Sequence, residues 1–565
     1  MPRSASNPIL RGFNPDPSIV RVDADYYIAT STFEWYPGIQ IHHSRDLANW
    51  RLLTRPLRRA SQLDMRGNPD SCGVWAPCLT HCDGLFHLVY TDVKRFGRSS
   101  AAGAAGASLR DFHNYLVTSP TIEGDWSEPV YLNSSGFDPS LFHDDDGRKY
   151  LVNMLWDHRP GMNRFAGIVL QEYSASEQRL IGPRHTIFTG TPIGFTEAPH
   201  LYKRNGWYYL LTAEGGTGWG HAVTMARSRT LAGPYELHPD VYILTARDRP
   251  DSPLQRAGHA DLVDTPDGET YMVYLCGRPL PTRGRCTLGR ETAIQRMVWG
   301  PDGWLRTTDG NATPHLEFEA AGNLMLPSAT PPAREDFDRE TLPIEFQWLR
   351  TPEPDRLFSL RANQGHLRLF GRESVGSLFT QSLVARRQQA HCFSASTLMT
   401  FEPDHFQQMA GLICYYNSSK FHYLYVSRDD NGRHLRVMSA LPDAVTADAF
   451  TPPIAAPAGP IELRVEVDFE RLLFAWRCGV DEWRWLPPVF DASILSDEAT
   501  APGLPNFTGA FVGMACQDLA GTGKPADFDW FEYRERDYIV HHDGSSRARA
   551  ADRPASSAAT MRSTS

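Results

Sequence analysis

The chain has 565 residues, more than one hydrophobic core usually supports, so at least two domains are expected. Its hydrophobic content of 41% is ample for packed cores. The sequence contains no apolar run of roughly 18 residues, the length that would predict a membrane-spanning helix. The net charge of −10 argues against nucleic acid or an anionic membrane as the main partner.

The N-terminal residues contain no apolar segment typical of a secretory signal. Nine scattered cysteines, an odd number, favour reduced thiols and predict a cytoplasmic location. Cys72, Cys78 and Cys82 form a cluster, but Cys78 lies in a predicted strand. We therefore expect it to pack rather than to bind a metal.

One sequence pattern recurs in the first 280 residues: a short apolar strand, an acidic or glycine turn, and an aromatic-rich strand. Its copies lie 60, 62, 60 and 61 residues apart and begin at Asp16, Ala76, Asp138, Ala198 and His259. Four copies carry Asp-Gly or Asn-Gly, which are strong hairpin signals. Each repeat has room for four strands, as in a propeller blade. The sequence therefore predicts an all-β fold in which residues 5–318 form a five-bladed β-propeller.

Equivalent positions of the five copies should surround the propeller axis. Asp16, Asp138 and Glu197, the residue before the fourth copy, would meet there, with Trp75 and His259 beside them. A single Asp before Pro often does no more than cap a turn. Three acids in register are different, because crowded like charges cost free energy that a structural role does not require.

The second half of the chain changes character after a Pro- and Ala-rich linker, predicted at residues 319–335. Residues 336–538 contain alternating strands without the 61-residue period, which predicts an antiparallel β-sandwich of jelly-roll or lectin-like type. Residues 539–565 are poor in apolar side chains and rich in Ser, Ala and Arg. We expect this tail to be disordered.

A ring of carboxylates suits cleavage of a glycosidic bond. That reaction requires one protonated acid beside the leaving oxygen and one ionised carboxylate on the opposite face of the sugar. A third acid can raise the pKa of its neighbour by like-charge repulsion. The number of carboxylates alone does not show which one is the acid and which one is the base. The rival interpretation, a non-catalytic sugar-binding propeller, would not need three acids.

Several motifs together resemble the beta-xylosidases of glycoside hydrolase family 43. They are NPDPSI at 14–19, STFEWYPGIQIHHSRDL at 31–47, GVWAP at 73–77, GFDPSLF at 136–142, TEAPHLY at 196–202, LGRETAIQ at 288–295 and GAFVGMACQD at 509–518. The resemblance covers both predicted domains. It implies an inverting hydrolase with Asp16 as general base and Glu197 as general acid, while Asp138 orients Glu197 and keeps its pKa raised.

The resemblance also implies an exo-acting enzyme that releases D-xylose from the non-reducing end of short beta-1,4-xylo-oligosaccharides. An alpha-L-arabinofuranosidase, or an enzyme with both activities, stays open because the two sugars place their hydroxyls similarly. The retaining enzymes that act on fructosides are disfavoured. Their Arg-Asp-Pro and Glu-Cys motifs do not match, since Asp138 follows Phe137 and Glu197 precedes Ala198.

The resemblance further implies substrate contacts at five positions: Phe33, Trp75, His259, Arg290 and Phe511. Each has a structural alternative. Arg290 could form a salt bridge with Glu291 or with another acid nearby, His259 could be a satisfied core histidine, and the aromatics could pack in the core. Phe511, from the sandwich, is expected to help close the pocket, so that only a chain end enters.

No cofactor is predicted, and no acidic calcium loop is visible. Some relatives place calcium near such a histidine, which leaves a metal at His259 open. The expected partner is a small xylo-oligosaccharide, without nucleic acid or membrane. The resemblance suggests a homo-oligomer, either a dimer or a tetramer.

Overall fold

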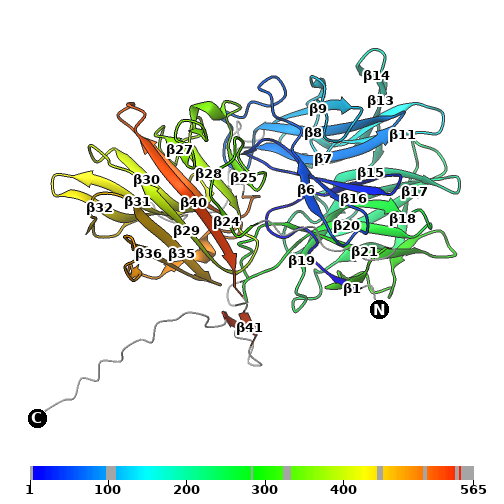
Figure 1. Ribbon diagram of the computed structural model, residues 1–565. Helices are drawn as coiled ribbons and strands as arrows, with labels where there is room; N and C mark the ends of the chain where they lie inside the picture. The colour runs from blue at the N-terminus through cyan, green and yellow to red at the C-terminus, as the bar shows by residue number, and fades with distance from the viewer. Residues whose placement is uncertain are drawn as a thin grey trace, which may run out of the picture.

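The computed structural model describes residues 4–96, 110–281, 284–321, 332–441, 449–499 and 506–536, with the backbone of 538–540 and 546–548. Two β-rich units lie side by side, the N-terminal one in blue to green and the C-terminal one in yellow-green to red (Figure 1). The helical elements within the described ranges are two short 3-10 turns, η1 (Pro354–Arg356) and η2 (Ala492–Ile494). The all-β prediction is confirmed.

The N-terminal unit contains five four-stranded antiparallel sheets, each formed by consecutive segments of the chain. The first three blades are β2 (Ser18–Val22), β3 (Asp25–Thr30), β5 (Gln40–Ser44) and β6 (Arg51–Thr54); β7 (Gly73–Cys82), β8 (Leu85–Arg95), β9 (Asp111–Ser119) and β10 (Val130–Asn133); and β11 (Ser140–His143), β12 (Lys149–Trp156), β13 (Phe165–Ser174) and β14 (Arg179–Phe188). The last two are β15 (Glu197–Arg204), β16 (Trp207–Glu214), β17 (Ala222–Ser228) and β18 (Glu236–Thr245); and β19 (Gln255–Asp264), β20 (Thr270–Gly277), β21 (Glu291–Trp299) and β22 (Leu305–Thr307). The predicted five-bladed propeller is confirmed.

The hairpin dipeptides shape the first turn of the blades. In Asp83-Gly84 and Asn205-Gly206 both residues have positive φ, between 50° and 73°. That is the backbone of a type I′ turn, whose twist matches the flanking strands. These two-residue turns fix the strand register, so that Cys82 pairs with Leu85 and Arg204 pairs with Trp207.

The propeller is closed by its own N-terminus. Strand β1 (Ser4–Ser6) pairs antiparallel with β23 (Glu317–Glu319), beyond the last blade. The buried Asn7 reinforces this closure, since its side-chain amide donates to the carbonyl oxygens of Ile294 and His315 at 2.7 and 2.8 Å. Both ends of the propeller are therefore fixed.

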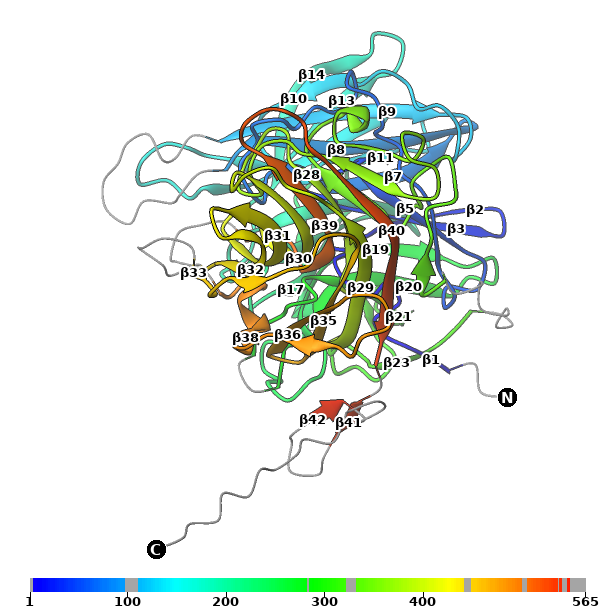
Figure 2. The same cartoon turned by 60° about the vertical axis from the view of Figure 1, so that its left-hand side comes forward.

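The C-terminal unit consists of two nine-stranded antiparallel sheets. One contains β33 (Ala449–Phe450), β32 (Gly432–Ala440), β31 (Lys420–Asp429), β30 (Gln408–Asn417), β39 (Phe511–Asp518), β28 (Ser382–Arg387), β25 (Phe346–Leu349) and β4 (Trp35–Tyr36), with β34 (Ile454–Ala455) paired to β32. The other contains β26 (Phe358–Ser359), β27 (Leu367–Phe370), β40 (Pro525–Glu535), β29 (Cys392–Thr400), β35 (Ile461–Asp468), β36 (Arg471–Arg477) and β37 (Arg484–Trp485), with β24 (Arg334–Glu335) paired to β40 and β38 (Phe490–Asp491) paired to β36. Figure 2 shows β40, β29 and β35 crossing this unit side by side. The predicted sandwich is confirmed.

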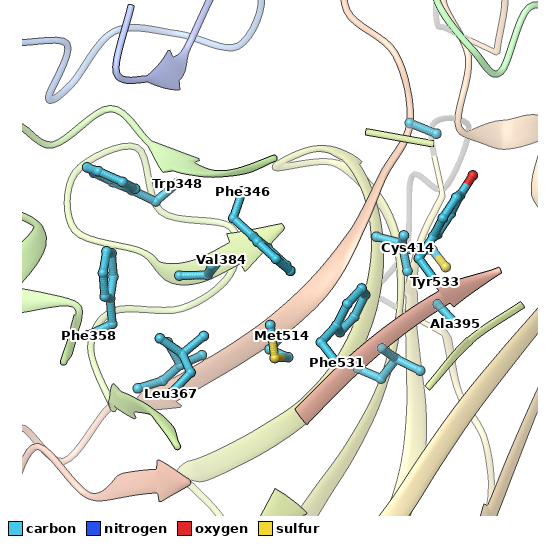
Figure 3. Packing of buried hydrophobic residues seen from close by; sticks show 14 of the residues in the cluster. Phe346, Trp348, Phe358, Leu367, Val384, Ala395, Cys414, Met514, Phe531 and Tyr533 are labelled. Atoms are coloured by element: carbon cyan, nitrogen blue, oxygen red, sulfur yellow. The ribbon is translucent and has the colours of Figure 1, made fainter. Parts of the chain in front are cut away.

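The sandwich core lies between these two sheets. Strand β35 alternates buried Ile461, Leu463 and Val465 with half-buried charged residues, as one covered face requires. Side chains from both sheets, among them Phe346, Met514 and Phe531, meet in the apolar interior (Figure 3). Apolar burial of this kind is the main stabilising contribution to such a fold.

The two units share a sheet. Strand β4 belongs in sequence to the first blade, yet Trp35 and Tyr36 pair with Leu349 and Trp348 of β25 in the sandwich. The propeller therefore contributes an edge strand to the neighbouring unit, which fixes the sandwich beside the propeller axis.

Two sequence expectations concern the ends of the sandwich. Within the predicted linker 319–335, residues 322–331 lie outside the described residues. Strand β41 (Tyr538–Val540) pairs with β42 (Ser546–Ala548), which places a backbone hairpin partly inside the tail expected to be disordered. The rest of that tail, 541–545 and 549–565, lies outside the described residues.

Candidate active site

A cavity of about 190 Å³ lies where the first strands of the blades converge. Its lining consists of Asp16, Phe33, Trp75, Phe96, Phe137, Asp138, Phe165, Glu197, Gly216, Thr217, His259, Arg290 and Phe507. Every propeller residue expected at the axis is among them. The three carboxylates that the repeat aligns are therefore brought together, with only 3–8% of each residue exposed.

The backbone explains why these side chains point inward. Asp16, Asp138, Ala198 and His259 each begin one copy of the repeat, and all have φ between 50° and 56°. Non-glycine residues seldom adopt this left-handed conformation, which costs free energy and concentrates at functional sites. The same local turn thus recurs in four blades and directs side chains to the axis.

Asp16 is held by two donors. Arg290 Nη1 donates to Asp16 Oδ1 at 2.7 Å, and Ser31 Oγ donates to Asp16 Oδ2 at 2.6 Å. His259 Nδ1 lies 3.6 Å from Oδ1. A charge-assisted bond from a guanidinium is short and directional, so it fixes the orientation of the carboxylate. Asp16 is therefore suited to act as a base.

Glu197 has a different environment. Among the described residues, none forms a hydrogen bond with its side-chain carboxyl group, although it lies in the cavity wall. Burial, and secondarily the negative charge of Asp16, raises the pKa of Glu197 to about 8, while Arg290 opposes the rise. The group is therefore protonated near neutral pH, as a general acid must be.

Asp138 acts on the backbone next to Glu197. Its Oδ2 accepts a hydrogen bond from the Ala198 backbone N–H at 3.1 Å. Burial, with the charges of Glu197 and Asp16, raises the pKa of Asp138 well above its ordinary value. The two carboxyl groups interact, since the charge of Glu197 contributes to the raised pKa of Asp138. The bond to the Ala198 N–H places Asp138 beside the backbone that carries Glu197.

Arg290 connects the propeller chemistry to the sandwich. Besides Asp16, it donates from Nη2 to the Phe507 carbonyl oxygen at 2.8 Å, and it is 3% exposed. The alternative pairing with Glu291 does not occur, because Glu291 instead binds Arg278 at 2.6 Å. Arg290 therefore holds both the carboxylate of Asp16 and the segment that carries Phe507.

His259 lies in the cavity wall, beside Asp16. Burial lowers its pKa to about 4, so the imidazole is neutral at pH 7. Among the described residues, no group of three or more His, Cys, Asp or Glu side chains is arranged to hold a metal ion. Cys78 of the cysteine cluster is buried in β7 and packs against hydrophobic side chains.

Aromatic rings form the apolar walls. The Phe33 and Trp75 ring centroids lie 5.7 Å apart, and Trp75 lies 5.5 Å from Phe507. Such faces suit the C–H surface of a sugar and exclude water from it. Phe33 and Trp75 are therefore placed where the resemblance implied.

Phe511 is not in this wall. It is 1% exposed and stacks on Trp35, with centroids 3.7 Å apart and an interplanar angle of 14°. The sandwich residue that lines the cavity is Phe507, four positions earlier. The expectation for Phe511 is corrected accordingly: it packs in the interface behind the cavity, because β39 begins at Phe511 and turns its ring toward β4.

Ser71 joins the two walls. Its Oγ accepts from the Phe507 backbone N–H at 3.1 Å, and its carbonyl oxygen accepts from Trp75 Nε1 at 2.9 Å. Its own backbone N–H donates to Glu34 Oε1 at 3.2 Å. This fully buried serine, with φ of 60°, therefore fixes both an indole and the sandwich segment opposite it.

Ser31 and Ser71 were not predicted from the sequence, and neither were six cavity residues: Phe96, Phe137, Phe165, Gly216, Thr217 and Phe507. Phe137 had a signal, since it directly precedes the aligned Asp138. The others lie at strand ends and in loops, away from the position that is equivalent in every copy of the repeat. The repeat therefore could not predict that they face the cavity.

Comparison with known proteins agrees with this geometry. Residues 5–305 match the model of glycosyl hydrolases family 43, and residues 334–534 match the beta xylosidase C-terminal concanavalin A-like domain. The chain therefore belongs to glycosyl hydrolases family 43, and it is a glycoside hydrolase.

Individual relatives extend over both domains. The chain is 54% identical over 543 residues to the xylosidase/arabinosidase 43B of Humicola insolens, which covers 94% of this chain and 97% of that protein. It is 48% identical over 550 residues to a beta-xylosidase of Bacillus subtilis, with coverage of 94% and 99%. The crystal structure of a xylan beta-1,4-xylosidase from Bacillus halodurans superposes with a TM-score of 0.90 and 50% identity, covering 94% of this chain and all of that one.

Proposed function

We propose that this protein is an inverting, exo-acting beta-xylosidase that releases D-xylose from the non-reducing end of short beta-1,4-xylo-oligosaccharides. Glu197 protonates the leaving glycosidic oxygen, and Asp16 accepts a proton from the water that attacks the anomeric carbon. Asp138 positions Glu197 through the backbone of Ala198. The C–O bond to the leaving group breaks as the new C–O bond to water forms, so the anomeric configuration inverts.

The observation that carries this proposal is the contrast between two carboxylates in one cavity. Asp16 receives hydrogen bonds from Arg290 and Ser31. The Glu197 carboxyl group has no such donor among the described residues, and its pKa is raised to about 8. Environments that separate two carboxyl groups in this way define an acid and a base.

The size of the cavity supports exo action. Its volume of about 190 Å³ is below the range of roughly 300–1,000 Å³ typical of pockets for drug-sized ligands. One pyranose ring fits this space better than an internal stretch of a chain does. The names of the three relatives described above all include xylosidase, which supports xylose as the sugar bound.

A second activity, release of terminal alpha-L-arabinofuranose, is favoured by one specific observation. The relative with 54% identity is named both xylosidase and arabinosidase. The Phe33, Trp75 and Phe507 walls present apolar faces and leave sugar selection to few polar groups. We therefore propose beta-xylosidase as the principal activity and arabinofuranosidase as the secondary one.

The Glu197→Gln variant tests the assignment. Loss of general-acid catalysis should lower kcat on xylobiose by about 10²–10⁴-fold. Glu236→Gln, an exposed glutamate on β18 of the same blade, serves as the matched control and should keep the parent rate. A Glu197→Gln enzyme that hydrolyses xylobiose at the parent rate would overturn the assignment.

The pH dependence gives a second test of Glu197. Since its raised pKa of about 8 keeps it protonated at neutral pH, activity should be present below pH 8 and lost as the pH rises through that value. Above it, kcat/KM on xylobiose should fall about tenfold per pH unit, as for loss of one proton. A profile flat to pH 10 in the parent enzyme would contradict Glu197 as the acid.

A further inference from the structure

An exposed aromatic residue lies next to the general acid. Phe195 is in the loop between β14 and β15, two residues before Glu197, and it is 54% exposed. Its φ of 55° is a left-handed conformation, which is rare for a bulky side chain and costs free energy. A single exposed apolar side chain needs no explanation by itself. Exposure combined with backbone strain, beside the acid, points to a functional reason for the position of this ring.

The loop that carries the ring is fixed by hydrogen bonds on both sides of it. The fully buried Glu214, which ends β16, accepts from the Thr191 backbone N–H at 3.0 Å and from Thr196 Oγ1 at 3.2 Å. Thr191 Oγ1 donates to the other carboxylate oxygen. The Gly194 carbonyl oxygen accepts from the Gly215 backbone N–H at 2.8 Å. A loop held in this way is preorganised, so a ligand that binds it loses little affinity to ordering of the backbone.

The exposed ring borders the cavity. Its centroid lies 5.0 Å from that of Phe165, with an interplanar angle of 77°. It also lies against Gly216, since a methyl group at that glycine would be 4.0 Å from Phe195 Cγ. Phe165 and Gly216 both line the cavity. Phe195 therefore continues the apolar wall of the cavity toward solvent.

This continuation is on the leaving-group side of the proposed reaction. Glu197 protonates the oxygen that joins the terminal sugar to the rest of the substrate. The cavity of about 190 Å³ suits one pyranose ring, so the next sugar lies outside it, beside the acid. An aromatic ring there can cover the C–H surface of that sugar.

We propose that Phe195, supported by Phe165, is the binding surface for the first sugar of the leaving group, a beta-linked xylopyranosyl unit that packs on the exposed ring. Phe195 then determines how strongly the enzyme favours xylo-oligosaccharides over xylosides with a small leaving group. This inference rests on the proposed function. It deepens that function by naming the residue that recognises the leaving sugar.

The Phe195→Ala variant tests the proposal on two substrates, xylobiose and methyl beta-D-xylopyranoside. Both need Glu197 to protonate a poor leaving group, but only xylobiose carries a sugar beyond the bond. For xylobiose, kcat/KM should fall about 5–20-fold, the effect of losing contact with roughly 40–70 Å² of apolar surface. For the methyl xyloside it should be unchanged. Phe195→Tyr keeps the aromatic ring and should keep the parent values on both substrates.

The control is Phe406→Ala, which removes a 65% exposed phenylalanine from the sandwich and should keep the parent rates. An equal fall on both substrates would show that Phe195 acts through Glu197 or the fold and would overturn the proposal, as would an unchanged rate on xylobiose. Light scattering tests the other use of an exposed ring: equal losses together with a changed molecular mass would assign Phe195 to a contact with a second copy of this chain.

Failure of the proposed function is distinguishable from failure of this inference. A parent protein that hydrolyses neither substrate would count against the function. In that event, calorimetric affinities of the parent and of Phe195→Ala for the same two compounds test the site without turnover. Xylobiose should bind the variant about 5–20-fold more weakly, with no change for the methyl xyloside. Equal xylobiose affinities of the two proteins would overturn the site.

Discussion

The two sides of the cavity are built in different ways. The carboxylate side comes from the propeller, where Asp16, Asp138 and Glu197 occupy equivalent or adjacent positions of one repeat. The opposite wall, Phe507, comes from the sandwich and is fixed by bonds to Ser71 and Arg290, 436 and 217 residues away in sequence. The chemistry is thus encoded in local repeats, whereas closure of the site depends on docking of two domains.

The largest effects are expected on the carboxylate side. Asp16→Asn should lower kcat by about 10²–10⁴-fold on xylobiose and equally on 4-nitrophenyl xyloside, because every substrate needs an activated water. Glu197→Gln should be much less harmful with the nitrophenyl substrate, whose leaving group departs without a proton. Steady-state kinetics of both variants on both substrates measures this contrast. If both variants lost kcat to the same extent on each of the two substrates, the assignment of one residue as base and the other as acid would be contradicted.

On the sandwich side, Phe507 and Phe511 should separate binding from stability. Phe511→Ala removes a fully buried ring and should destabilise the protein by about 3–5 kcal/mol, measured from the urea midpoint. Phe507→Ala removes a half-buried cavity wall and should raise KM by about tenfold or more, corresponding to about 1–3 kcal/mol of binding. If Phe511→Ala raised KM at unchanged stability, the correction made for this residue would be wrong.

A smaller effect is expected where the two sides meet. Ser71→Ala leaves the Phe507 N–H without its acceptor and should raise KM about 5–10-fold, in line with about 1–3 kcal/mol for an unsatisfied buried group. Ser382→Ala is the matched control, since its buried Oγ donates to the Leu357 carbonyl oxygen inside the sandwich. Both variants should lose stability, but only the first should change KM. Identical kinetics would leave Ser71 a purely structural role.

The repeat made much of the propeller predictable from sequence. A constant spacing aligns Asp16, Asp138 and His259, and their shared left-handed φ shows that the alignment reflects one backbone geometry. The Asp-Gly and Asn-Gly turns fixed hairpin register, because register in a tight hairpin follows from its turn. The first strand of each blade could therefore be positioned without knowledge of the rest of the chain.

The parts that could not be predicted depend on contacts between distant segments. Strand β4 looks like a loop of the first blade, and only β25 of the sandwich makes it a strand. Residues 506–510 have no strand pattern, so nothing in sequence distinguished Phe507 from Phe511 as the cavity wall. The cytoplasmic location and the homo-oligomeric state stay predictions.

The most direct test of the account follows the anomeric configuration of xylose by proton NMR during early hydrolysis of xylobiose. A base and an acid on opposite faces of the sugar require a single displacement by water, so alpha-D-xylose should appear first and only later equilibrate with the beta anomer. Initial release of beta-D-xylose would show retention. That result would contradict the assignment of Asp16 as the base that activates water.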